Sequence, residues 1–165
     1  MKKKLASIAL TAVLMVSFAV NAFAAIESVD EIDSKIDGLT QISNLDFTRF
    51  VNKSDLIGDR LQNFNMATAQ YQNAAFVTQE TLKSIISQIE ILNSSSDIST
   101  TERTMQINKL YQDADTALYN MDSKTIQYLY SIRSLMPTLT YQKFSKKYKD
   151  FYNDLNISNS KFLSK

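Results

Sequence analysis

The sequence predicts an all-α fold: an elongated antiparallel helical bundle or hairpin of three to four helices with coiled-coil-like heptad seams. Its 165 residues include only two glycines and one proline, so turns are few and the elements between them must be long. Apolar residues make up 44% of the chain. In long segments they recur at alternating steps of three and four, the spacing that places side chains on one face of a helix.

Residues 1–24 have the pattern of a bacterial-type signal peptide. Three lysines at positions 2–4 precede the 16-residue run LASIALTAVLMVSFAV, and the AFA sequence at 22–24 has the small residues that a signal peptidase requires. The run is shorter than the roughly 20 residues that span a bilayer, which disfavours an uncleaved membrane anchor. We therefore expect cleavage between Ala24 and Ala25 and a secreted or periplasmic protein with no stable membrane span.

The remaining residues, 25–165, are predicted to form a single helical-bundle domain. Its helices are expected at about 26–42, 45–93, 101–136 and 139–156. Pro137 separates the last two, because proline lacks an amide donor and disfavours the helical conformation of the residue before it. The first helix has the weakest apolar stripe, which consists of Val29, Ile32, Ile36 and Leu39.

The segment 45–93 has the most regular pattern. Its predicted inward positions are Phe47, Phe50, Ser54, Ile57, Leu61, Phe64, Thr68, Tyr71, Ala75, Thr78, Leu82, Ile85, Ile89 and Leu92. Eleven of these fourteen are apolar, whereas a 44% apolar composition would give about six, so a sustained heptad seam is indicated. One continuous helix is expected here, with Ser43 or Asn44 as its N-cap and Gly58 as its weakest point.

A second seam follows the polar loop NSSSDIST. Its positions are Ile107, Tyr111, Ala114, Leu118, Met121, Thr125, Tyr128, Ile132 and Leu135. Ser99 and Glu102 form a capping-box pattern before it. Phe76 and Val77 lie opposite the first seam, so a further helix or a second copy of the chain is expected to cover them. The pattern leaves open an intrachain bundle and self-association.

Residue types that support catalysis are scarce. The chain contains no histidine and no cysteine, the commonest proton-transfer residue and the thiolate nucleophile. Two glycines in all make phosphate-binding loops hard to build. Two sets of acidic residues are expected on solvated helix faces rather than around a metal. The first set is Asp30, Glu31, Asp33 and Asp37, and the second is Asp113, Asp115 and Asp122. We expect no enzyme activity, no cofactor and no catalytic or metal-binding residues.

The C-terminal sequence YQKFSKKYKDFYNDL alternates aromatic residues with lysines. The stripe Tyr141, Phe144, Tyr148, Phe151 and Leu155 has heptad spacing, which predicts that it faces the core. The residues left for contact with an anionic surface, such as lipid headgroups or a cell-wall polymer, are Lys143, Lys146, Lys147, Lys149 and Tyr152.

These features favour an exported, non-enzymatic interaction protein. An adhesin, a surface or matrix component and a partner-binding coiled coil all fit, with a protein or cell-surface partner. The alternative is a periplasmic holdase-type or stress chaperone. Removal of residues 1–24 leaves 15 basic against 17 acidic residues, a net charge of −2, so nucleic acid is not an expected partner.

We predict that the exported protein begins at Ala25, because Phe23 would occupy a small-residue position if the cut fell one residue later. Intact-mass spectrometry of exported material should give the mass of residues 25–165. Recovery of a membrane-bound species that retains residues 1–24 would contradict this prediction.

Overall fold

The computed structural model describes residues 26–51 and 55–158. The predicted signal peptide and the seam position Ser54 lie outside these ranges. Within them the chain is all-helical, which confirms the all-α part of the prediction. The elements are α2 (Val29–Ser43), the short 3-10 helix η1 (Phe47–Phe50), α3 (Asp59–Ser94), α4 (Thr100–Arg133) and α5 (Thr138–Asp154).

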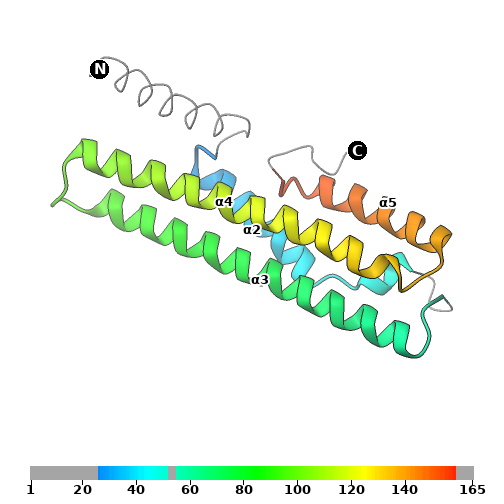
Figure 1. Ribbon diagram of the computed structural model, residues 1–165. Coiled ribbons are helices and arrows are strands. Elements are labelled where there is room, and N and C mark those ends of the chain that lie inside the picture. Colours follow the sequence, from blue (N-terminus) through cyan, green and yellow to red (C-terminus); the bar gives the residue numbers. More distant parts are fainter. Residues whose placement is uncertain (1–25, 52–54, 159–165) are drawn as a thin grey trace, which may run out of the picture.

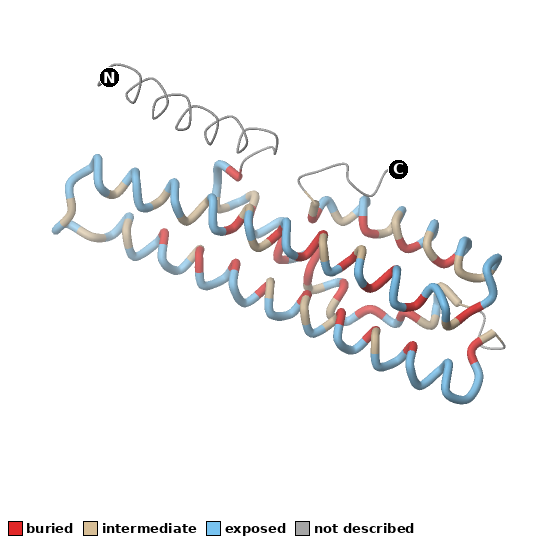
Figure 2. The backbone as a smooth tube through the Cα atoms, in the orientation of Figure 1, coloured by how far each residue is buried: buried red, intermediate tan, exposed pale blue. Residues whose placement is uncertain are grey.

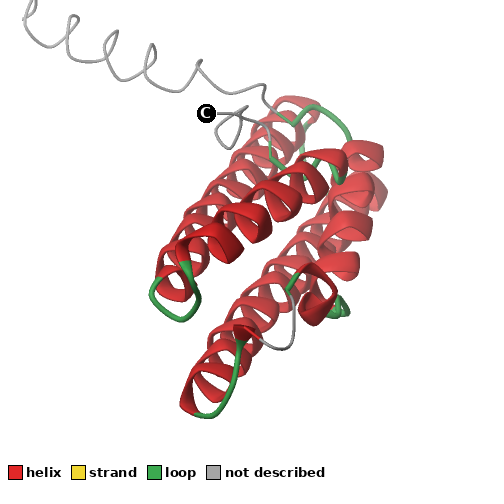
Figure 3. Cartoon of the chain, turned by 90° about the vertical axis from the view of Figure 1, so that its right-hand side faces the viewer, coloured by secondary structure: helices red, strands yellow, loops and turns green. Residues whose placement is uncertain are grey.

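The four α-helices pack side by side, and consecutive helices run in opposite directions (Figure 1). α3 and α4 form a hairpin, α2 packs against α3, and α5 packs against α4 and η1. The end-on view shows the helices grouped around a common interior (Figure 3). Near its turn, the hairpin extends beyond both α2 and α5 (Figure 1). Among the described helices, none combines the length and the apolar character needed to cross a membrane.

Side chains satisfy the free backbone groups at several helix ends. The Ser99 hydroxyl accepts a hydrogen bond from the Glu102 N–H, as the capping pattern predicts. α5 starts directly after Pro137. At the C-terminal end of α2, Gln72 Nε2 donates to the carbonyl oxygens of Ser43 and Leu45, both at 3.0 Å. This glutamine therefore ties α3 to the end of α2.

The prediction of one helix over 45–93 is wrong in its first third. Asn44 is the C-cap of α2 rather than an N-cap. Asp46 caps η1 through the Thr48 N–H, and α3 begins only after Gly58, whose φ is +56°. This left-handed conformation suits glycine and interrupts the helix. The break allows Phe47 to turn into the core, where it is 2% exposed.

After this break, the helix faces agree with the predicted patterns. All α4 seam positions are buried or half-buried, and so are those of α3 from Phe64 to Leu92. Figure 2 shows the buried residues on the sides of the helices that face one another. The exceptions are Ile57 and Leu61, which are 71% and 37% exposed. Phe76 and Val77 remain about half exposed, so the described chain does not cover them fully.

α2 approaches the C-terminal segment closely at Gly38. A Cβ atom at this position would lie 2.6 Å from Ile157 Cγ1, a distance that side chains do not tolerate. Ile157 is fully buried. The absence of a side chain at Gly38 therefore allows the residues after α5 to pack onto α2.

We predict that Ile85→Asp unfolds the protein and that Leu61→Asp does not. Ile85 is 4% exposed and Leu61 is 37% exposed on the same helix. A buried, unpaired carboxylate costs several kcal/mol, a large part of the stability of a small domain. Thermal melts followed by circular dichroism measure the difference. Equal melting temperatures for the two variants would show that the burial of α3 is assigned incorrectly.

Candidate interaction surface

α5 has a buried aromatic face and an exposed lysine face. Phe144 and Tyr148 are fully buried, as predicted for the aromatic stripe. Lys143, Lys146 and Lys147 are exposed, whereas Lys149 is half-buried. Within residues 26–51 and 55–158, none of the three exposed ammonium groups takes part in an ion pair. We call Lys143, Lys146 and Lys147 the lysine face.

The expectation that Tyr152 is available for contact is wrong, because this side chain is fully buried. Its hydroxyl donates a hydrogen bond to Asp122 Oδ1 at 2.8 Å. The buried face of α5 runs through Phe144, Tyr148 and Tyr152 in steps of four, and residues so spaced form one ridge on a helix. The heptad spacing used for the prediction places Phe151 inward instead, but Phe151 is only half-buried.

The sequence pattern also predicts the wrong position for Asp122. It places this residue on the outer face of α4, but Asp122 is 6% exposed. Besides the hydrogen bond from Tyr152, Asp122 accepts one from the Ser158 hydroxyl at 2.7 Å. Nearby, the Lys35 ammonium donates to the Asn156 carbonyl at 2.7 Å. Burial lowers the pKa of Lys35, and Glu31, Asp115 and Asp122 oppose this shift. Polar groups from α2, α4 and the C-terminal segment thus meet in the interior.

The other expected outer-face carboxylates differ in exposure. On α2, Asp30, Asp33 and Asp37 are exposed, in agreement with the prediction, and Glu31 is half-buried. On α4, Asp113 is exposed and Asp115 is half-buried. Across the described part of the chain, no three acidic residues come together as a metal site would require.

A cluster of buried tyrosines packs against the inner side of α5, the helix that carries the lysine face. The rings of Tyr71 and Tyr128 stack at 4.6 Å with an interplanar angle of 4°. The Tyr71 hydroxyl lies 2.6 Å from that of Tyr148 and 2.8 Å from that of Thr125. Tyr128 pairs with Thr68 at 3.0 Å. The two threonines occupy seam positions because they supply hydrogen-bonding partners for buried phenols.

Burial also controls the protonation of these tyrosines. It raises the pKa of Tyr71, Tyr128, Tyr148 and Tyr152 above the ordinary tyrosine value. A neutral phenol is a weak base and a weak nucleophile near neutral pH. The tyrosines therefore act as packed, hydrogen-bonded core residues that hold α3, α4 and α5 together.

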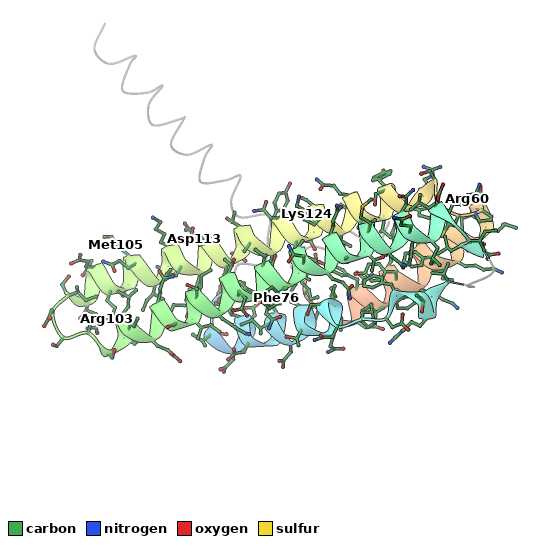
Figure 4. The ribbon with its side chains drawn as sticks, turned by 90° about the horizontal axis from the view of Figure 1, so that it is seen from below. Arg60, Phe76, Arg103, Met105, Asp113 and Lys124 are labelled. Carbon is green, nitrogen blue, oxygen red and sulfur yellow. The ribbon has the colours of Figure 1, made fainter. Side chains whose placement is uncertain are left out.

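Two grooves lie between α3 and α4. Tyr71 and Tyr128 contribute to the first, which has a volume of about 290 Å³ and polar walls that include Lys124. The second, of about 350 Å³, lies nearer the turn of the hairpin, where Leu92 and Leu110 contribute apolar walls. Ile91 and Met105 are 63% and 64% exposed in this part of the hairpin, and Figure 4 shows Met105 close to the turn.

Comparison of the chain with protein-family models, with characterised proteins and with solved structures found no match in any of the three.

We predict that alkaline pH unfolds the protein through its buried tyrosines. The four phenols with raised pKa values bind their protons more tightly in the folded than in the unfolded chain, so their stabilising effect is complete below pH 10 and decreases above it. Between pH 9 and 11 the loss should be on the order of 5 kcal/mol for four such groups. Circular dichroism and tyrosinate absorbance should change together.

The control variant for this experiment is Tyr130→Phe, since Tyr130 is 68% exposed. This variant should show the same alkaline transition as the wild type. Tyr152→Phe should instead reduce the slope of stability against pH by about a quarter, because one of four titrating groups is lost. Ionisation of all tyrosines without loss of helicity would contradict the prediction.

Proposed function

We propose that the chain is an exported, non-enzymatic interaction protein that binds an anionic partner surface through the lysine face of α5. The observation that supports this most is the set of three exposed ammonium groups on one helix, positioned by a fully buried aromatic face. Cationic side chains near an anionic surface contribute about 1 kcal/mol each. A protein or polymer of the cell surface, or lipid headgroups, would present such charges.

The spacing of the lysine face suits a surface rather than a pocket. Lys146 and Lys147 follow Lys143 by three and four positions, so both are its neighbours on the surface of α5. Asp150 is exposed one turn further along α5, so an acidic residue follows the lysine face. A flat, repeating array of negative charges would meet all three ammonium groups together.

Export is proposed from the N-terminal pattern of a lysine cluster, an apolar run and a small-residue cleavage site. The lack of histidine and cysteine supports a role in binding rather than catalysis. For the shape, we propose an elongated bundle with coiled-coil-like seams. A 36-residue α3 is about 54 Å long at 1.5 Å per residue, and inward positions recur along it at steps of three and four.

A holdase-type chaperone is the second candidate. The exposed Ile91 and Met105, together with the apolar walls of the neighbouring groove, favour it, because unfolded clients bind to apolar surface. The two functions differ in selectivity. A holdase suppresses the aggregation of unrelated unfolded proteins, whereas an interaction protein with a charged binding face retains one partner class and loses it as salt concentration rises.

We predict that replacing Lys143, Lys146 and Lys147 by glutamine weakens binding to phosphatidylglycerol-containing vesicles by on the order of 100-fold at low salt, since three ammonium groups are lost. Co-sedimentation measures it, with phosphatidylcholine vesicles as the neutral control. Helicity should be unchanged, because all three side chains are exposed.

The matched control carries glutamine at Lys83, Lys109 and Lys124, which are exposed on α3 and α4. It changes the net charge by the same amount, so its binding should remain close to that of the wild type. Equal weakening of both variants would indicate a general charge effect and would reject the lysine face as the binding surface. Equal binding by all three proteins would reject it as well.

A further inference from the structure

Ile26, the first described residue, is fixed by burial and by a long-range hydrogen bond. Ile26 is 2% exposed. Its backbone N–H donates to the Asp115 carboxylate, with distances of 3.2 Å to Oδ1 and 3.4 Å to Oδ2. Asp115 belongs to α4 and is 89 positions away in sequence. The point where the chain enters the bundle is therefore defined by a long-range contact as well as by burial.

This contact lies next to the expected cleavage site. The backbone nitrogen of Ala25 is separated from that of Ile26 by two bonded atoms, so the two nitrogens lie within about 3.7 Å in any conformation. In a chain that begins at Ala25, the first nitrogen is an α-ammonium. Covalent geometry alone then keeps this cation within about 7 Å of the Asp115 carboxylate.

Two further carboxylates lie in the region of Asp115. Glu31, Asp115 and Asp122 all act electrostatically on the ammonium of Lys35. The backbone N–H of Glu27, the residue after Ile26, donates to Glu31 Oε2 at 3.4 Å. An ammonium at the start of the chain would strengthen the contact with Asp115, because a charged donor binds a carboxylate more strongly than a neutral amide does.

We propose that Asp115 is the binding site for the α-ammonium of a chain that begins at Ala25, so that removal of residues 1–24 creates the cation that completes this contact. The inference rests on the proposed export and cleavage. Hydrolysis of the Ala24–Ala25 peptide bond by a signal peptidase consumes one water, leaves a carboxylate on Ala24 and converts a neutral amide nitrogen into the ammonium of Ala25. The processing step thereby stabilises the bundle that it releases.

The test compares two forms of residues 25–165, a chain that contains every described residue. One has a free α-amine at Ala25 and the other is acetylated there. At pH 6.5 the acetylated form should have an unfolding equilibrium constant about three- to tenfold higher, the range expected for a partly exposed, charged hydrogen bond. Denaturant titration followed by circular dichroism measures this constant.

The pH dependence provides a second readout. An α-amine that pairs with Asp115 has a pKa above its unfolded value of about 7.7 to 8.0. Its stabilising effect is therefore complete below that range and is lost as pH rises through the folded value. The other groups in this region, Glu27, Glu31, Lys35 and Asp122, are common to both forms. The two stability curves should converge above about pH 9.5, where the α-amine is neutral.

Two substitutions locate the effect. Asp115→Asn should abolish the difference between the free and acetylated forms. Asp113→Asn should preserve it, because Asp113 is exposed on the same helix two positions away, and Figure 4 shows it on the α4 ribbon. A difference that persists in Asp115→Asn, or no difference in the wild type, would overturn the proposal.

If Asp115→Asn does not fold, nuclear magnetic resonance of the wild type decides the question. The pKa of the Ala25 amine should lie above 8.0, and a value at or below the unfolded range would overturn the proposal. Because the N-terminus is set during preparation, these outcomes do not depend on whether cells export the chain. The mass of the exported protein tests that separate point.

Discussion

The fold depends on the packing of aromatic rings around Tyr71 and Tyr128. Their stacked pair joins α3 to α4. Tyr148 brings α5 onto the pair through the Tyr71 hydroxyl, and Phe47 adds η1 at 5.4 Å from the Tyr128 ring. These side chains combine large buried area with directional hydrogen bonds. The position of the lysine face follows from this cluster, since α5 cannot rotate without moving Tyr148.

A second set of contacts secures the two ends of the described chain to α4. Asp115 holds the backbone before α2, and Asp122 holds Tyr152 and Ser158 at the other end. The two carboxylates are seven positions apart, so they lie on nearly the same side of the helix. The Lys35 ammonium interacts electrostatically with both carboxylates and donates a hydrogen bond to the Asn156 carbonyl oxygen. Removing Asp122 would take this acceptor away from the buried Tyr152 hydroxyl.

Much of the architecture could be predicted from local periodicity. The inward faces of α3 and α4, the Ser99 cap and the start of α5 all depend on residues close together in sequence. The break at Gly58 could not be predicted in this way, because a glycine tolerates both a helix and a left-handed turn. The burial of Phe47 against the ring of Tyr128, 81 positions away, is likewise not encoded in local periodicity. The pattern misplaces Tyr152 and Asp122 because each is the other's hydrogen-bond partner across 30 positions, and the heptad spacing selects Phe151 rather than Tyr152 as the inward residue.

The turn between α3 and α4 lies far along the hairpin from Asp115 and Asp122. Ile26 contacts Asp115 and Ser158 contacts Asp122, whereas α4 starts at Thr100. Fifteen residues of helix, about 22 Å at 1.5 Å per residue, therefore separate the start of α4 from Asp115, the nearer of the two contact residues. The exposed apolar residues near the turn, Ile91 and Met105, therefore lie on a part of the hairpin that these two contacts do not reach.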